Sequence, residues 1–228
     1  MQGDSEAGLH VADVSRRFGR RWAVARASFS LAPGERLMLT GANGSGKTTL
    51  LRCLATALKP DHGEIRLAGE CLWTHRDRHR ASIAYFSHAP RLYDDLNATD
   101  NLKVWARLGE YSIDAHSLLE QVGLPPDRTE PVRTFSAGMR RRLAFARILM
   151  QKPRLVLLDE PFSALDPEGR TQLVKLVDTL CGDTAVLIVA THLPRTAISL
   201  CHHGIHMEAG QITWRGAHDD HPLLKGAT

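Results

Sequence analysis

Short apolar runs alternate along this chain with stretches of helical periodicity. The run at 36–40 and the later runs at 155–158 and 185–190 are rich in leucine, valine and isoleucine, and each precedes a segment that fits a helix. Apolar strands separated by helices are typical of a parallel sheet that is buried on both faces. The pattern therefore predicts an α/β fold.

Other segments add antiparallel structure and a helical region to this core. Residues 9–14 and 27–31 alternate as antiparallel strands do, and the helix expected over 47–58 should stop at Pro60. From residue 88 to about 150 the pattern is helical, which predicts a helical lobe inserted into the α/β core. The predicted strands are 9–14, 27–31, 36–40, 65–68, 82–86, 155–158, 185–190, and a hairpin of 204–208 with 211–215 around Ala209-Gly210.

Composition and charge narrow the class of protein. The 228 residues are 43% apolar and 24% charged, which is ordinary for a globular domain and excludes disorder and disulfide scaffolds. The net charge of +4 is too weak to indicate nucleic acid, whose binding proteins carry clustered basic stripes, whereas an anionic ligand or a membrane surface fits it equally well. We expect the basic runs at 75–80 and 140–142 to be solvated faces.

Nothing in the sequence predicts export or a membrane span. No apolar run approaches the roughly 18 residues that cross a bilayer, and the first residues lack the basic and apolar regions of a secretory signal. We therefore expect a cytoplasmic protein. The four cysteines are far apart without C-x-x-C spacing, so we interpret them as reduced, buried thiols, with a metal or redox role as the alternative.

Residues 41–48 form a phosphate-binding motif. Gly41-Ala-Asn-Gly-Ser-Gly-Lys-Thr48 matches G-x-x-x-x-G-K-[ST] between a predicted strand and a predicted helix. Its glycines allow a nest of backbone N–H donors, backed by a helix N-terminus, to attract phosphate oxygens. Lys47 is expected to bridge the outer phosphates, and the Thr48 hydroxyl to ligate Mg²⁺. The residues expected to bind phosphate here are Gly41, Ala42, Asn43, Gly44, Ser45, Gly46, Lys47, Thr48 and Thr49.

A second motif supplies carboxylates. The apolar strand Leu155-Val-Leu-Leu ends in Asp159 and Glu160. Mg²⁺ prefers oxygen ligands and keeps several waters, so Asp159 is expected to hold it through a water. Glu160 follows and is the candidate general base that polarises an attacking water. An Asp-Glu pair alone is more often merely solvated, and the phosphate motif favours the functional interpretation.

With these two motifs and three further ones, the chain resembles the nucleotide-binding subunits of ATP-binding-cassette (ABC) transporters over essentially its full length. Phe135-Ser-Ala-Gly-Met-Arg140 is similar to the family's L-S-G-G-Q signature, Ser163-Ala-Leu-Asp166 to its D-loop, and Thr191-His192 to its switch histidine. The resemblance implies one ABC nucleotide-binding domain over 1–228. That domain combines a RecA-like P-loop NTPase core, an antiparallel β subdomain and an inserted helical lobe.

The resemblance also implies roles that cross between subunits. Two copies, or one copy and a paired subunit, would enclose two ATP molecules head to tail. Ser136 and Gly138 of each would face the γ-phosphate held by the other, although Ser136 is also suited to capping a helix. His192 would contact the γ-phosphate and assist Glu160. Phe18 falls where the family stacks an aromatic on adenine; Trp22 is a nearby competitor, and core packing is the alternative for either residue.

Two departures from the family pattern stand out. The signature has Ala137 in place of glycine and Met139 in place of glutamine, and alanine is strained there only if its φ is positive. His88 occupies the position of a glutamine that approaches the metal. Because imidazole is a softer ligand than an amide oxygen, we expect His88 to reach the metal's water or the γ-phosphate indirectly. The alternative is a loop histidine facing solvent.

His88 and the Phe-Ser-Ala-Gly signature resemble one branch of the family, the ATPase subunits of the haem-exporter complex of cytochrome c maturation. This implies an ATP-hydrolysing subunit, peripheral on the cytoplasmic face of the cell membrane, bound to integral-membrane permease subunits and not to nucleic acid. In the family, residues corresponding to 91–97 form a groove for a permease helix, and we expect Leu92, Tyr93 and Leu96 to be exposed there. The alternative is that these residues only pack the lobe. Alternatives are the ATPase of another exporter for drugs or lipids, or a non-transport ABC ATPase.

Overall fold

A computed structural model describes residues 7–87, 91–163, 165–192 and 194–225, with the backbone alone for 224 and 225. The chain divides into two compact units, each built from segments that are distant in the sequence. Unit 1 comprises Met1–Tyr85, Pro153–Pro161 and Cys181–Thr228, and unit 2 comprises Phe86–Lys152 and Phe162–Leu180. None of the described helices has the length and apolar character needed to span a bilayer.

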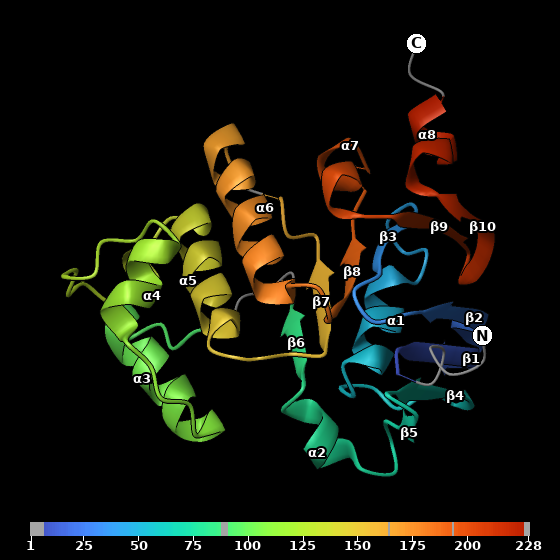
Figure 1. The fold of residues 1–228 in the computed structure, drawn as a ribbon, viewed down its shortest axis with the longest axis horizontal. Coiled ribbons are helices and arrows are strands. Elements are labelled where there is room, and N and C mark those ends of the chain that lie inside the picture. Colours follow the sequence, from blue (N-terminus) through green and yellow to red (C-terminus); the bar gives the residue numbers. More distant parts are fainter. Residues whose placement is uncertain (1–6, 88–90, 164, 193, 226–228) are drawn as a thin grey trace. The chain divides into compact units, whose positions relative to one another are not determined.

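Unit 1 is built around a six-stranded sheet in the order β10-β9-β3-β8-β7-β6. The strands β7, β8, β3 and β9 run parallel, and β10 pairs antiparallel with β9 (Figure 1). Every residue of β7 and β8 is buried, so these are the apolar strands that the sequence predicts. The bounds are β3 Arg36–Thr40, β6 Ile83–Phe86, β7 Leu155–Asp159, β8 Val186–Ala190, β9 His203–Glu208 and β10 Gln211–Ala217.

A second sheet of unit 1 is antiparallel, in the order β2-β1-β4-β5. Its strands are β1 Leu9–Phe18, β2 Arg21–Leu31, β4 His62–Leu67 and β5 Glu70–Cys71. Leu9, Val24 and Ile65 from this sheet lie in one buried cluster with Leu50 and Leu54 of helix α1, Lys47–Leu54. The remaining helices and 3₁₀ turns of this unit are α2 Arg76–Arg80, α7 Pro194–Ala197, Ile198–Leu200, His218–Asp220 and α8 Pro222–Lys225.

Unit 2 is helical and contains most of the segment expected as an inserted lobe. Side-chain caps begin three of its helices: Asn97 accepts from Asp100 N, Asp114 from His116 N and Ser117 N, and Ser136 from Met139 N. These caps match the preference of helix N-termini for short polar side chains. The helical elements are α3 Ala98–Gly109, α4 Ala115–Gln121, the 3₁₀ turn Val132–Thr134, α5 Ala137–Leu149 and most of α6 Pro167–Cys181.

Two predictions about local structure are wrong. The helix expected over 47–58 ends at Leu54, because Thr56 adopts a left-handed φ of 54° and Arg52 O accepts from the N–H groups of Ala57 and Leu58. That hydrogen-bonded reversal terminates the helix well before Pro60.

The basic runs are not uniformly solvated either. Arg141 is only 6% exposed and His79 only 7%. Arg141 lies over the Phe86 ring and donates to Ser163 Oγ within unit 2. The Arg141 guanidinium therefore has its partners inside unit 2 and not in solvent, which the sequence alone does not reveal.

Candidate nucleotide site

The candidate site lies where three parallel strands of unit 1 end. Leu39 of β3 and Asp159 of β7 both align with Ala190 of β8, which lies between them. The carboxyl ends of these strands therefore meet at one edge of the sheet. The loop after β3, the carboxylates after β7 and His192 after β8 all begin at this edge, as expected for a ligand site of an α/β fold.

The nucleotide loop, residues 41–48, needs its glycines for two separate reasons. Gly41, Gly44 and Gly46 have φ values of 143°, 79° and 109°, which L-residues rarely adopt. A Cβ on Gly41 would lie 2.3 Å from Met207 O, and one on Gly46 would lie 2.1 Å from Ala23 O. The loop therefore packs closely on its neighbours and leads directly into the N-terminus of α1, where backbone N–H groups attract anions.

Lys47 is buried within this loop, with 6% of its surface exposed. Its Nζ donates to Gly41 O at 2.7 Å and to Ala42 O at 3.1 Å. Burial lowers the pKa of Lys47, and the nearby charges of Glu160 and Asp159 oppose that shift. The side chain is thus held against the loop that it would serve in binding phosphate.

The neighbouring loop residues divide into exposed and buried positions. Ala42, Asn43, Gly44 and Thr48 are exposed, whereas Thr49 is half-buried. Ser45 is buried, and its Oγ has no hydrogen-bond partner among the described residues. An orphaned polar atom of this kind fits a loop completed by a polar ligand.

The donor set beside the loop fits magnesium. Asp159 is 1% exposed at the end of β7, and Thr48 is an exposed residue in the first turn of α1. Both supply oxygen, which Mg²⁺ prefers to nitrogen or sulfur.

Glu160 and His192 form a hydrogen-bonded pair at the same edge. Glu160 Oε1 accepts from His192 N at 3.0 Å, and the His192 Nδ1 lies 2.8 Å from Glu160 Oε2. The Glu160 side chain is 15% exposed and that of His192 is 49% exposed. Glu160 also adopts a φ of 50°, a strained value for a non-glycine residue and one that clusters at functional sites.

The two aromatic candidates near the end of β1 lie on the surface. Phe18 is 51% exposed and Trp22 is 38% exposed, so the core-packing alternative is wrong for both. The Arg16 guanidinium lies 5.2 Å from the Phe18 ring centroid, and that of Arg17 lies 5.7 Å from Trp22. Each ring therefore has a guanidinium near it and keeps part of its surface exposed.

Comparison with known proteins agrees with this geometry. A family model described as ABC transporter matches residues 24–163. The chain is 35% identical over 202 residues to a cytochrome c biogenesis ATP-binding export protein, CcmA, from Nitrosococcus oceani, covering 89% of this chain and 92% of that protein. The chain belongs to the ABC transporter family. It is an ATP-binding subunit with ATPase activity, as the sequence motifs predict.

Two further comparisons, one by sequence and one by structure, also match this chain to ABC proteins. It is 34% identical to an uncharacterized ABC transporter ATP-binding protein, YxlF, of Bacillus subtilis, covering 91% of this chain and 70% of that one. A solved ATP-binding subunit of an ABC transporter superposes with a TM-score of 0.84 at 26% identity, covering 96% of this chain and 95% of that one. The ABC-type α/β fold expected from the sequence is therefore confirmed.

The signature segment of this ABC subunit, residues 135–140, lies in unit 2. Ser136 is exposed and caps α5 by accepting from Met139 N at 3.2 Å, so the capping role is present. Ala137 is helical and has no positive φ, which means that alanine causes no strain there. Gly138 follows in the first turn of α5.

Other expected residues are only partly described. His88 lies outside the described residues, as does Ala164 of the D-loop. All four cysteines are thiols; Cys53, Cys181 and Cys201 are buried, but Cys71 is only half-buried. Burial raises the pKa of the Cys53 thiol to about 12, which leaves it unreactive.

One support of the nucleotide loop comes from residues that no sequence motif marks. Gly210 N donates to Ser45 O at 2.9 Å, and Met207 O lies against Gly41. The hairpin of β9 and β10 therefore braces the loop from the far end of the chain. The only available signal was the Ala209-Gly210 turn, which indicates a hairpin but not what the hairpin contacts.

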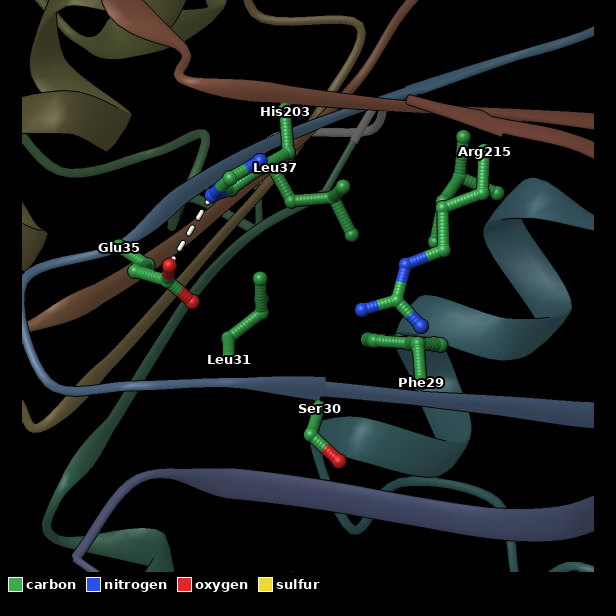
Figure 2. A pocket seen from close by; sticks show the side chains of 8 residues that line it. Phe29, Ser30, Leu31, Glu35, Leu37, His203 and Arg215 are labelled. Carbon is green, nitrogen blue, oxygen red and sulfur yellow. Dashed lines mark hydrogen bonds and ion pairs between the residues drawn. The ribbon is translucent and has the colours of Figure 1, made fainter. Parts of the chain in front are cut away.

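A separate pocket of about 70 Å³ lies elsewhere in unit 1. Figure 2 shows the Glu35–His203 pair on one side and the Arg215 guanidinium on the other, with Leu31 and Leu37 between them. Its eight lining residues include none from the nucleotide loop. It is too small for a nucleotide and is not the candidate site.

Proposed function

We propose that this chain is the Mg²⁺-dependent ATP-hydrolysing subunit of a membrane exporter, in the haem-export branch that serves cytochrome c biogenesis. The observation that carries the catalytic part is the Glu160–His192 pair, at the same sheet edge as the nucleotide loop and Asp159. A carboxylate and an imidazole beside a phosphate-binding loop suit hydrolysis as well as binding.

The loop and its neighbours hold the triphosphate. Backbone N–H groups of residues 41–49 bind phosphate oxygens, and Lys47 bridges the outer phosphates. Thr48 would ligate Mg²⁺, and Asp159 would hold it through a water. The ion would supply positive charge to offset the charge that develops on the phosphate oxygens.

Glu160 and His192 act on the terminal phosphate. Glu160 accepts a proton from the attacking water, since its carboxylate lies at the same edge of the sheet as the nucleotide loop. His192 contacts the γ-phosphate and orients Glu160 through the bonds that join them. Phosphoryl transfer depends mainly on such positioning and on charge stabilisation.

The signature segment completes the site of a second copy or of a paired subunit. Ser136 and Gly138 stand at the N-terminus of α5, a 13-residue helix whose dipole favours an anion. We propose that they face the γ-phosphate bound by the partner's loop. His88, at the position of the family's glutamine, is proposed to approach the metal's water or that phosphate.

Phe18 is proposed to stack on adenine. Replacing Phe18 with alanine is expected to weaken ATP binding about 3- to 10-fold, because a lost aromatic contact costs about 0.5–1.5 kcal/mol. Trp22→Ala, which removes a similarly exposed ring four residues along, is expected to bind ATP as the wild type does. Fluorescence titration with an ATP analogue measures both dissociation constants. A larger loss in Trp22→Ala would reverse the assignment.

Unit 2 offers a docking surface for the permease. Tyr93 is 42% exposed, whereas Leu92 and Leu96 are half-buried, so the expected exposure is wrong for these two leucines. The Tyr93 ring lies 6.1 Å from that of Trp105, which the Arg147 guanidinium covers at 4.5 Å. Beside Tyr93, Asp94 pairs with Arg140 and Asp95 pairs with Arg133, so both carboxylates face a positive charge. We propose that a cytoplasmic permease helix binds here and holds the subunit at the cytoplasmic face of the membrane.

The haem branch rests on the similarity to CcmA over most of both chains. Deleting the gene is expected to remove covalently bound haem from c-type cytochromes, measured as haem-dependent peroxidase bands in membrane fractions. Wild-type protein should restore the bands, whereas Glu160→Gln should not. Pull-down from detergent-solubilised membranes should also recover a multi-span permease.

Normal c-type cytochromes in the deletion strain would contradict the haem branch while leaving the ATPase assignment in place. The second candidate is the ATPase of another exporter, which the comparable identity to the Bacillus subtilis protein favours. A recovered drug- or lipid-export permease would establish that alternative, and recovery of ribosomes or DNA without a permease would overturn both.

A further inference from the structure

The hydroxyl of Thr40 is the meeting point of three segments of unit 1. Thr40 is the last residue of β3 and directly precedes Gly41, the first residue of the nucleotide loop. Its Oγ1 donates to Ile205 O at 3.1 Å and lies 2.9 Å from His206 Nδ1 and 2.6 Å from His221 Nε2. One donor and two acceptor positions are all that a hydroxyl offers, so Thr40 is fully used.

The hydrogen bonds of His221 define how it meets Thr40. Leu223 N donates to His221 Nδ1 at 3.2 Å, so Nδ1 is the acceptor. In a neutral ring the proton is then on Nε2, which donates to Thr40 Oγ1. Burial, followed by the charge of His206, lowers the pKa of His221 and keeps the ring neutral. Both ring nitrogens therefore have defined partners.

The surroundings are built to hold this ring. His221 is 0% exposed, and its ring lies 4.8 Å from that of Trp214 on β10. Gly204 leaves room for both rings, since a Cβ there would lie 3.0 Å from His221 Cδ2 and 2.9 Å from Trp214 Cζ3. A histidine so close to the end of the chain is thus packed as firmly as a core residue.

The hairpin of β9 and β10, which packs around His221, also contacts the nucleotide loop. Met207, two residues after Ile205 on β9, presents its carbonyl to Gly41 and its Cε to Gly46. Gly210, at the turn of the hairpin, donates to Ser45 O. Displacement of β9 or of the end of β3 would therefore move the loop that carries Lys47.

We propose that His221 is a positioning residue for the nucleotide loop. By donating to Thr40, it ties the C-terminal segment to the end of β3 and holds Gly41 and Lys47 in the arrangement that binds the triphosphate. This inference rests on the nucleotide site proposed above. It gives the C-terminal segment a part in ATP binding, through geometry and without touching the ligand.

Two substitutions at His221 separate positioning from simple packing. The amide nitrogen of His221→Gln reaches the place of Nε2 and keeps the donor to Thr40. His221→Asn reaches only the place of Nδ1, so it keeps the acceptor for Leu223 N and loses the Thr40 bond. We expect His221→Asn to raise the KM and the Kd for ATP about 3- to 10-fold, the effect of one lost hydrogen bond, with kcat within about twofold of wild type. His221→Gln should keep near wild-type values.

Substitutions at Thr40 provide the reciprocal test. Thr40→Ser retains the hydroxyl and should keep the KM of wild type, whereas Thr40→Val removes it at nearly constant volume and should raise the KM as His221→Asn does. His218→Gln, in the same C-terminal segment, is the matched control and should bind ATP normally. Melting temperatures show which variants fold.

Equal ATP affinities for folded His221→Asn and His221→Gln would overturn the proposal, as would a Thr40→Val protein with an unchanged KM. Failure of the nucleotide site itself would look different. In that case Lys47→Ala would bind ATP as tightly as the wild type, whatever the His221 variants did.

Discussion

Glu160→Gln is expected to slow ATP hydrolysis about 10²- to 10⁴-fold while ATP binding stays intact, the range for loss of a general base. Glutamine has nearly the same shape, and its carbonyl oxygen can still accept from His192 N, a bond of 3.0 Å in the native protein. What it cannot do is take a proton from water. Phosphate release and equilibrium ATP binding, measured on the same preparation, separate the two effects.

Glu120→Gln serves as the matched control, because Glu120 is 62% exposed on α4 and pairs only weakly with His116 at 3.8 Å. It should hydrolyse ATP at the wild-type rate. A Glu160→Gln protein with full turnover would refute the general-base role. Parallel loss of binding and turnover would instead indicate that Glu160 supports the loop.

The candidate site could be proposed from the sequence because its chemistry is local. A phosphate nest requires glycines at fixed spacing, so Gly41, Gly44 and Gly46 can be recognised without knowing what surrounds them. Asp159 and Glu160 are likewise marked by the apolar strand that they end. The pairing of strands then brings these motifs to one edge, and the α/β pattern already implies that edge.

The contacts that brace the site were not predictable, because they join residues far apart in the chain. Thr40 and His221 are separated by 181 positions, and neither belongs to a motif. Periodicity places a residue on a strand but does not say which distant side chain completes its hydrogen bonds. The support from Met207 and Gly210 was hidden for the same reason.

Local errors had local physical causes. The helix predicted over 47–58 was too long because Thr56 adopts a left-handed φ, and threonine as a residue type does not signal that conformation. Arg141 was expected on a solvated face because arginine is rarely buried. Its place over the Phe86 ring, with Ser163 as acceptor, depends on tertiary packing that a run of three basic residues cannot reveal.

Lys47→Ala is expected to weaken ATP binding at least about 10-fold and up to about 150-fold. Hydrogen bonds to charged groups contribute about 1.5–3 kcal/mol, and alanine removes the charge that would meet the outer phosphates. It also leaves Gly41 O and Ala42 O without the donor that links them, at 2.7 and 3.1 Å, so the loop loses an internal brace. Titration with a fluorescent ATP analogue measures the change, and Lys59→Ala, which removes an exposed lysine, should leave the affinity unchanged.

The melting temperature of Lys47→Ala should show whether its weaker ATP binding comes from unfolding. Burial lowers the pKa of Lys47, so the folded protein disfavours the charged ammonium relative to the unfolded chain at every pH below the usual lysine value. Removing that charge relieves a cost of folding and offsets the contacts that the side chain loses. We therefore expect a melting temperature close to that of the wild type without nucleotide, and much less stabilisation when ATP is added. A variant that still gains the full ATP-dependent shift in melting temperature would contradict the role of Lys47 in holding the triphosphate.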